Sequence, residues 1–138
     1  MREALKEAQK AFDKDEIPIG AVIVAENKII ARAHNLTETL NDVTAHAEMQ
    51  AITSAANYIG GKYLTDCTLY VTIEPCVMCA GALAWSQITK IVYGASETKK
   101  GYSLLEKSVL HPKTTIVKGV LSEECEKIMK DFFVKKRK

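Results

Sequence analysis

The sequence predicts an α/β fold with three layers, in which a central mixed sheet of five strands lies between helices. Two observations carry this prediction. β-rich runs alternate with helical segments along the chain, and the first two runs are separated by a short polar turn, which indicates an antiparallel hairpin near the N-terminus. The length of 138 residues, with 47% hydrophobic and 26% charged residues, fits one globular domain spanning residues 1–138.

The N-terminal part predicts one helix and the hairpin. Apolar residues recur at helical spacing within residues 2–14, and polar residues with a proline end that pattern. The runs 20–25 and 28–33 are apolar and β-rich and flank Glu26-Asn27, which we expect to form the hairpin turn. The apolar stripe of the helix is expected to cover the sheet.

The remaining elements follow a polar loop over residues 35–43. An alanine-rich helix is predicted from Thr44 to Gly60, because glycine can take the left-handed conformation that ends a helix. Further strands are predicted over 68–73, 88–93 and 115–118, and further helices over 76–86 and 122–134, the last one opened by Ser122.

Composition excludes several classes of protein. No stretch approaches the roughly 18–20 consecutive apolar residues that span a bilayer, and the charged N-terminus is unlike a secretory signal. We therefore expect a cytoplasmic protein without membrane contact, whose four cysteines stay reduced. Six of the last thirteen residues are Lys or Arg, which is typical of a solvated tail but can also attract phosphates.

Two short motifs indicate a metal site. Zinc prefers imidazole and thiolate ligands, and a catalytic zinc keeps three protein ligands and one open position. His46, Cys76 and Cys79 supply that number, and the three-residue spacing of the cysteines places both on one face of a first helical turn after Pro75. The helix dipole there also favours thiolates.

Glu48, two residues after His46, is the candidate catalytic group. Hydrolytic removal of an amine requires a carboxylate that moves the water proton to the ring and to the leaving nitrogen. Residues at i and i+2 project roughly 200° apart on an ideal helix, so His46 and Glu48 converge only near a helix start. Either motif alone is weak, because redox dithiols and structural zinc sites share the Cys-x-x-Cys spacing, but together they favour a catalytic zinc site. The combination of H-x-E with P-C-x-x-C about thirty residues later resembles the signature of zinc nucleobase deaminases.

The chain resembles the cytidine/deoxycytidylate deaminase superfamily and, within it, the bacterial tRNA-specific adenosine deaminases. The similarity covers nearly the whole chain, in the segments IPIGAVIV, HN, TAHAEMQAI, LYVTIEPCVMCAGAL, IVYGA and GVLSEECEKIMKDFFVKKR. The PCVMCAGA run and the terminal FF-x-KKR pattern favour the tRNA branch. The segment 94–119 is shorter than in the best-known members and lacks their Gly-Ser-rich loop.

This resemblance implies a set of roles. His46, Cys76 and Cys79 would bind one Zn²⁺ per chain and Glu48 would shuttle protons, while Asn35 and the backbone N–H of Ala47 would face the purine. It further implies a cytidine deaminase-like fold, a homodimer, and conversion of the wobble adenosine of a tRNA anticodon loop to inosine. Such a substrate fits single-stranded RNA recognition, in which a loop base is splayed into a pocket.

Three other functions compete with this interpretation. A deaminase of a free base or nucleoside, such as guanine, cytosine or cytidine, would use the same four residues. A non-catalytic, zinc-stabilised RNA-binding module would have no use for Glu48. A thiol-disulfide oxidoreductase would leave His46 and Glu48 unexplained.

Several other chemically distinctive residues have structural interpretations. Cysteine is among the most often buried residue types, and neither Cys67 nor Cys125 has ligand spacing. Structural or surface roles are expected for the two histidines outside the motif, and packing in the core or a dimer for the large aromatic residues. These residues are His34, His111, Trp85, Phe132 and Phe133.

Overall fold

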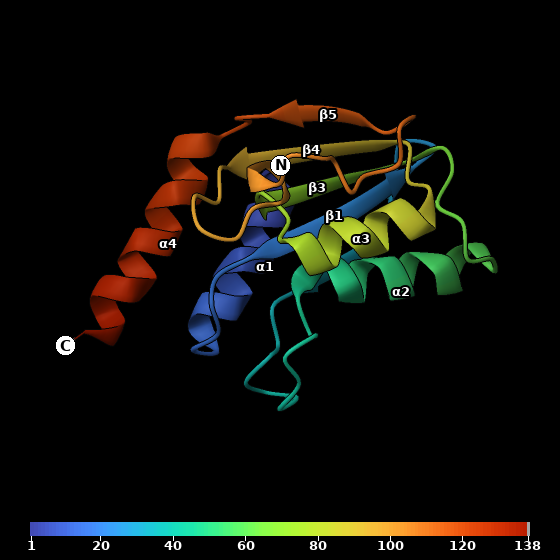
Figure 1. The fold of residues 1–138 in the computed structure, drawn as a ribbon. Coiled ribbons are helices and arrows are strands. Elements are labelled where there is room, and N and C mark those ends of the chain that lie inside the picture. Colours follow the sequence, from blue (N-terminus) through green and yellow to red (C-terminus); the bar gives the residue numbers. More distant parts are fainter. Residues whose placement is uncertain (138) are drawn as a thin grey trace.

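The computed structural model describes residues 1–137 and contains one five-stranded sheet with helices on both faces (Figure 1). The strands lie in the order β2-β1-β3-β4-β5. In chain order the elements are α1 (Arg2–Asp13), β1 (Gly20–Ala25), β2 (Lys28–His34), α2 (Ala47–Ile59), β3 (Cys67–Ile73), α3 (Val77–Ser86), β4 (Lys90–Ala95), the 3₁₀ helix η1 (Tyr102–Leu104), β5 (Thr115–Lys118) and α4 (Ser122–Lys136).

The sheet is mixed, as predicted. β1 pairs antiparallel with both β2 and β3, whereas β3, β4 and β5 run parallel. Glu26 and Asn27 form the predicted hairpin turn, with φ values of 51° and 62°. Two consecutive left-handed residues are the geometry that matches the twist of paired strands. The predicted hairpin and five-stranded sheet are therefore confirmed.

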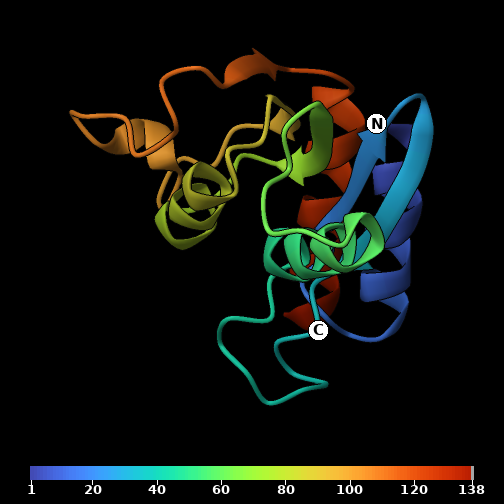
Figure 2. The same ribbon diagram turned by 90° about the vertical axis from the view of Figure 1, so that its right-hand side faces the viewer.

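The helices form the two outer layers. α1 and α4 contact the sheet from one side, and α2 and α3 contact each other and cover the opposite face (Figure 2). The core between α2, α3 and the sheet is built largely of alanine and branched aliphatic side chains, among them Ala51, Leu69 and Leu83. Small side chains on the helices let their backbones approach the sheet closely.

Helix α1 rests almost directly on the first strand. Its inward face consists of the fully buried Ala4, Ala8 and Ala11. A Cβ atom added to Gly20 would collide with the backbone oxygen of Ala4 and the backbone nitrogen of Ala8. The glycine is thus required for space, and it sets the distance between the helix and the sheet.

Several predicted boundaries were wrong. α2 begins at Ala47 rather than Thr44, and α3 begins at Val77 rather than Cys76, because an extended residue precedes each helix. The fourth strand spans Lys90–Ala95 instead of 88–93. The last helix begins at Ser122 as predicted but continues to Lys136, so part of the basic C-terminus is helical; Lys138 lies outside the described residues.

Within residues 1–137, every helix is too short or too polar to cross a bilayer.

The close contact between α1 and β1 predicts a specific sensitivity. Gly20→Ala should lower the free energy of unfolding by about 1–3 kcal/mol, since the new methyl group meets backbone atoms that cannot rotate away. Gly61→Ala is the control, because nothing lies within 4 Å of a Cβ atom added there, and its effect should stay within about 0.5 kcal/mol. Urea unfolding of both variants measures the difference, and equal stabilities would contradict this account of the packing.

Candidate active site

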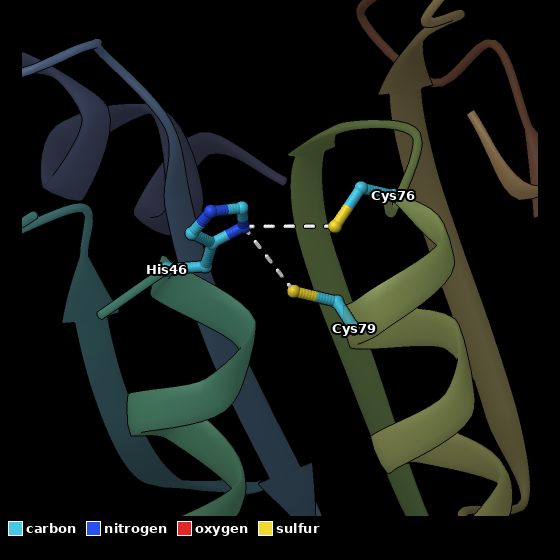
Figure 3. A group of neighbouring side chains, drawn as sticks. All are labelled: His46, Cys76 and Cys79. Carbon is cyan, nitrogen blue, oxygen red and sulfur yellow. Dashed lines mark hydrogen bonds between the residues drawn. The ribbon is translucent and has the colours of Figure 1, made fainter. Parts of the chain in front are cut away.

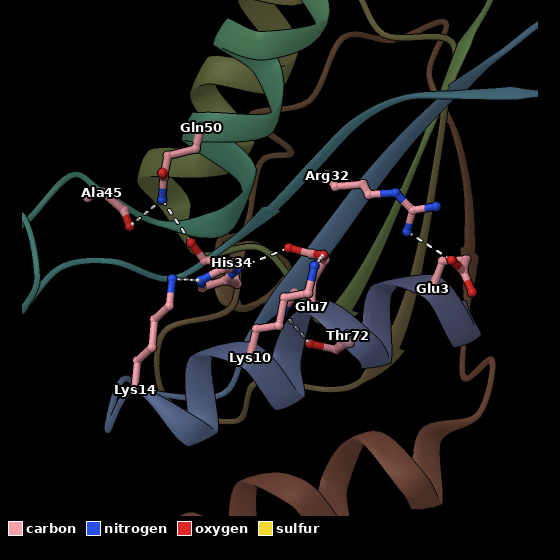
Figure 4. Close-up of polar contacts among 10 residues, drawn as sticks. Glu3, Glu7, Lys10, Lys14, Arg32, His34, Ala45, Gln50 and Thr72 are labelled. Atoms are coloured by element: carbon pink, nitrogen blue, oxygen red, sulfur yellow. Dashed lines mark hydrogen bonds and ion pairs between the residues drawn. The ribbon is translucent and has the colours of Figure 1, made fainter.

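His46 stands immediately before α2. Its backbone is extended, with φ −70° and ψ 155°, and it occupies the N-cap position. The preceding loop is fixed by Gln50, whose Nε2 donates hydrogen bonds to the carbonyl oxygens of His34 at 2.8 Å and Ala45 at 3.2 Å (Figure 4). His46 and Glu48 were expected to converge only near a helix start. They do lie at the start of α2, where both side chains can reach one site.

The two cysteines lie at the start of α3. Cys76 is the extended N-cap residue that follows β3 and Pro75, and Cys79 is buried in the first turn of the helix. The N-terminal ends of α2 and α3 therefore present their side chains to the same point. Both helix ends carry partial positive charge, which favours thiolate at this position.

His46, Cys76 and Cys79 form one cluster (Figure 3). The Nδ1 atom of His46 lies 3.5 Å from Sγ of Cys79 and 3.7 Å from Sγ of Cys76, and one donor atom from each residue fits within 4.8 Å. Donors at Zn–S and Zn–N bond lengths in a tetrahedron are separated by about 3.6 Å. One nitrogen and two sulfur donors at these separations fit zinc.

The three side chains of the cluster shift one another's pKa values. The Cys79 thiol donates a hydrogen bond to Cys76 and, with His46, lowers the pKa of Cys76 to about 4 despite its partial burial. The same contact with Cys76, together with burial, raises the pKa of Cys79. Cys76 also raises the pKa of His46. The arrangement thus stabilises one thiolate, at Cys76, and a metal ion must displace the protons that Cys79 and His46 hold, because only deprotonated side chains are ligands.

Glu48 differs from the other buried polar side chains among residues 1–137. It is 2% exposed, and its Oε1 is the one fully buried side-chain oxygen or nitrogen in that range without a hydrogen-bond partner. Burial, reinforced by the negative charge of Cys76, raises its pKa to about 7. A buried carboxyl group left unpaired beside a ligand cluster is suited to exchange protons near neutral pH.

The predicted substrate-binding residues share a cavity with these groups. A cavity of about 470 Å³ is lined by His46, Glu48 and Cys76 and also by Asn35 and Ala47. Its volume suits a small ligand or a single nucleobase. Oδ1 of Asn35 accepts a hydrogen bond from Thr37 N at 3.2 Å, which fixes the orientation of the amide group in the wall.

Sequence analysis missed several residues of the cavity wall. Thr37 and Phe133 contribute from the loop after β2 and from α4, and the segment 97–100 contributes from the loop after β4. Glu74, between β3 and Pro75, also lines the cavity. In the sequence, only its position directly before Pro75-Cys76 indicated that Glu74 lies near the site.

The histidines outside the motif have local polar contacts. His34 Nδ1 lies 3.0 Å from Oε1 of the buried Glu7, and its Nε2 lies 3.1 Å from Lys14 Nζ (Figure 4). His111 Nδ1 accepts a hydrogen bond from Lys113 N. His34 therefore joins the hairpin to α1, as a structural histidine would.

The remaining cysteines and aromatic residues divide into two groups. Cys67, Cys125 and Phe132 are buried, in line with structural roles. Trp85 is 85% exposed, so packing in the core of a single chain was the wrong expectation for it. Phe133 is 40% exposed and lines the cavity, and it does not belong to the core either.

Comparisons with known proteins agree on a deaminase. The model of the MafB19-like deaminase family matches residues 1–137. The tRNA-specific adenosine deaminase of Bacillus subtilis is 48% identical over all of this chain and 89% of its own length, and that of Aquifex aeolicus is 43% identical over 99% of this chain and 93% of its own.

Solved structures give the same result. One from studies of A-to-I editing by tRNA:A34 deaminases superimposes with a TM-score of 0.87 at 40% identity, covering 93% of this chain and 96% of that one. Guanine deaminase from Bacillus subtilis gives 0.67 at 41% identity, covering 70% and 62%. The deaminase resemblance found in the sequence is thereby confirmed. The chain belongs to the MafB19-like deaminase family, and relatives of nearly its own length are named tRNA-specific adenosine deaminases.

Proposed function

We propose that the chain is a single zinc-dependent hydrolytic deaminase domain that converts the wobble adenosine of a tRNA anticodon loop to inosine. The observation that carries the proposal is that the His46, Cys76 and Cys79 cluster opens, through His46 and Cys76, into the same cavity as Glu48, whose Oε1 is buried without a hydrogen-bond partner. Its support for a tRNA substrate comes from relatives named tRNA-specific adenosine deaminase and from the structure described for tRNA:A34 deaminases.

Each residue then has a defined task. His46, Cys76 and Cys79 would hold one Zn²⁺, which when bound would lower the pKa of water to about 7 and so supply a nucleophile at neutral pH. Glu48 takes one proton from the attacking water at its unpaired Oε1 and delivers it to the ring nitrogen. It then carries the second proton, from the hydroxyl group that the ring carbon has gained, to the amine, which leaves as ammonia as the ring carbonyl forms.

Asn35 and Ala47 orient the base. Because Thr37 N already occupies Oδ1 of Asn35, the Nδ2 group of Asn35 is the one available to donate to a purine nitrogen. The N–H of Ala47 is the first in α2 and has no partner within the helix, so it can donate to the base as well. The burial of both residues holds their donors in place before the substrate arrives.

The proposal extends to assembly and location. The exposed face of α3 is apolar, with Val77, Met78 and Trp85, and Leu104 and Leu105 of the neighbouring η1 segment are also exposed. Such a face fits a homodimer. The enzyme works in the cytoplasm, where tRNA is used.

A second candidate is deamination of a free base, in particular guanine. The specific observation in its favour is the 41% identity to guanine deaminase over 70% of this chain. The cavity volume would accommodate either a free base or a base splayed out of a loop.

The substrate is tested directly by nucleoside analysis. An anticodon stem-loop with adenosine at the wobble position should yield inosine at that position only, and guanine, cytosine and cytidine should react at least about 100-fold more slowly, because they lack the flanking contacts that contribute binding energy. Chromatography of the digested stem-loop measures the product. Turnover of guanine with an unchanged stem-loop would assign the chain to the second candidate.

Metal content tests the ligand set. The purified protein should hold one zinc ion per chain, and Cys76→Ala or Cys79→Ala should lose most of it and melt at a lower temperature, since metal binding is coupled to folding. Cys125→Ala is the matched control, because it removes a buried thiol outside the cluster and should keep the zinc. Elemental analysis with thermal unfolding measures both effects. Full zinc in Cys76→Ala would remove that residue from the site.

Glu48 is tested by its neutral analogue. Glu48→Gln keeps the size of the side chain but cannot carry the proton, so kcat should fall by about 10²–10⁴-fold or more while the zinc content stays unchanged. Single-turnover assays on the stem-loop, with parallel zinc analysis, separate chemistry from metal loading. Near-normal turnover would exclude Glu48 from proton transfer, and lost zinc would make it a ligand.

The dimer is tested at its most exposed aromatic residue. Trp85→Glu should weaken self-association by at least about 30-fold, because a large aromatic side chain at the centre of an interface is typically worth about 2 kcal/mol or more. Val134→Glu places the same charge on α4, where the valine is 50% exposed, and should leave association unchanged. Sedimentation equilibrium measures both variants, and a monomeric unmodified protein would contradict the homodimer.

A further inference from the structure

The cavity is bordered on one side by a loop that a single buried side chain holds in place. The segment 96–103 follows β4, and its residues Glu97, Thr98, Lys99 and Lys100 line the cavity. The loop contains no long regular element that would fix it, since only the short η1 begins at Tyr102. Its position must therefore come from contacts with neighbouring elements.

Glu74 supplies these contacts from both of its oxygens. Oε1 accepts a hydrogen bond from Glu97 N at 3.2 Å, and Oε2 accepts from Ser103 N at 3.0 Å and from Ser103 Oγ at 2.6 Å. The side chain is 3% exposed. Three donors at the two ends of one loop thus converge on a buried carboxyl group, and hydrogen bonds to charged groups are among the strongest in proteins.

The same loop is attached to the segment that carries Cys76. Gly101 and Cys76 form an antiparallel β-bridge, and Tyr102 N donates to Pro75 O at 3.0 Å. Glu74, Pro75 and Cys76 are consecutive. The loop is therefore anchored by the side chain of Glu74 and by the backbone of the two residues that follow it.

Gly101 shows how tightly the loop is seated. Its φ of −64° and ψ of 144° suit any residue, so the backbone conformation does not require glycine. A Cβ atom there would collide with Oε2 of Glu74 and would lie 2.6 Å from both Cδ of Glu74 and O of Glu97. The position therefore requires glycine because the carboxyl group of Glu74 and the backbone oxygen of Glu97 fill the adjacent space.

We propose that Glu74 is a positioning residue, which fixes the loop 96–103 and so places Glu97, Lys99 and Lys100 at the cavity for the substrate. The effect of this positioning on substrate binding rests on the proposed tRNA substrate. Lys99 and Lys100 are exposed cations at the cavity, so their placement affects the binding of a phosphate-bearing loop more than the chemical step.

Two variants disturb the contact from opposite sides. Glu74→Ala removes the acceptor, and Gly101→Ala adds a methyl group against it, while Gly61→Ala is the control glycine with open space around it. In the first two variants the amides of Glu97 and Ser103 should exchange hydrogen at least about tenfold faster, with protection of α2 and the zinc content unchanged. The KM for the stem-loop should rise about tenfold, with kcat within about threefold of the unmodified value.

The conservative variant and the double variant separate positioning from general destabilisation. Glu74→Gln keeps one acceptor oxygen and should restore part of the loop protection and of the KM. In a Glu74→Ala background, Gly101→Ala should raise the KM by a smaller factor than it does alone, because only the clash with the backbone oxygen of Glu97 remains and the loop is already released. Additive effects, or protection of Glu97 and Ser103 that survives in Glu74→Ala, would overturn the proposal.

The kinetic outcome is decisive on its own. Faster exchange in the loop with an unchanged KM would also overturn the proposal, because the loop would then be held without consequence for the substrate. Hydrogen exchange and zinc analysis do not depend on the substrate. Should the unmodified protein act on guanine and not on the stem-loop, the proposed tRNA activity fails, while the exchange measurements still decide whether Glu74 holds the loop.

Discussion

The site depends on one constraint, which is that the N-terminal ends of α2 and α3 meet. α2 supplies His46 and Glu48 and α3 supplies Cys76 and Cys79, from positions about thirty residues apart in the sequence. Both helices pack on the same face through small side chains such as Ala51 and Ala80, which belong to one buried cluster. Bulkier residues there would separate the helices, and the donor atoms would no longer lie within 4.8 Å.

Four buried glutamates, Glu7, Glu16, Glu48 and Glu74, differ in how many hydrogen bonds their carboxyl groups accept. Burial acts to raise the pKa of Glu7 and of Glu16, yet hydrogen bonds hold both pKa values below the ordinary range, from Lys10 and His34 in one case and from the Thr39 hydroxyl and two backbone amides in the other. Glu74 likewise has three donors.

Glu48 is as buried as these residues, but its Oε1 has no hydrogen-bond partner, and burial raises its pKa to about 7. The fold thus satisfies its structural carboxyl groups and leaves one carboxyl oxygen unsatisfied at the site. Local rules of stability are most often broken where a protein carries out its function.

The sequence predicted what depends on local pattern. The hairpin followed from two β-rich runs around Glu26-Asn27, and the ligand set followed from the spacing of Cys76 and Cys79 with a histidine in front of a second helix. Helix starts were misplaced because His46 and Cys76 have side chains compatible with a helix, whereas their backbones are extended. Glu74 was missed because its three partners lie more than twenty residues away, and no local pattern reports them.

The two outer strands limit how copies of this chain can associate. Among residues 1–137, β2 and β5 each have one edge without a neighbouring strand, and an open edge favours pairing with another sheet. Both edges carry exposed cations, Lys28 and Arg32 on β2 and Lys118 on β5, and β5 is only four residues long. Extending the sheet from one molecule into the next would bring these charges together and remove them from water. Edge-to-edge polymerisation is therefore disfavoured, and association is directed to the helical layers.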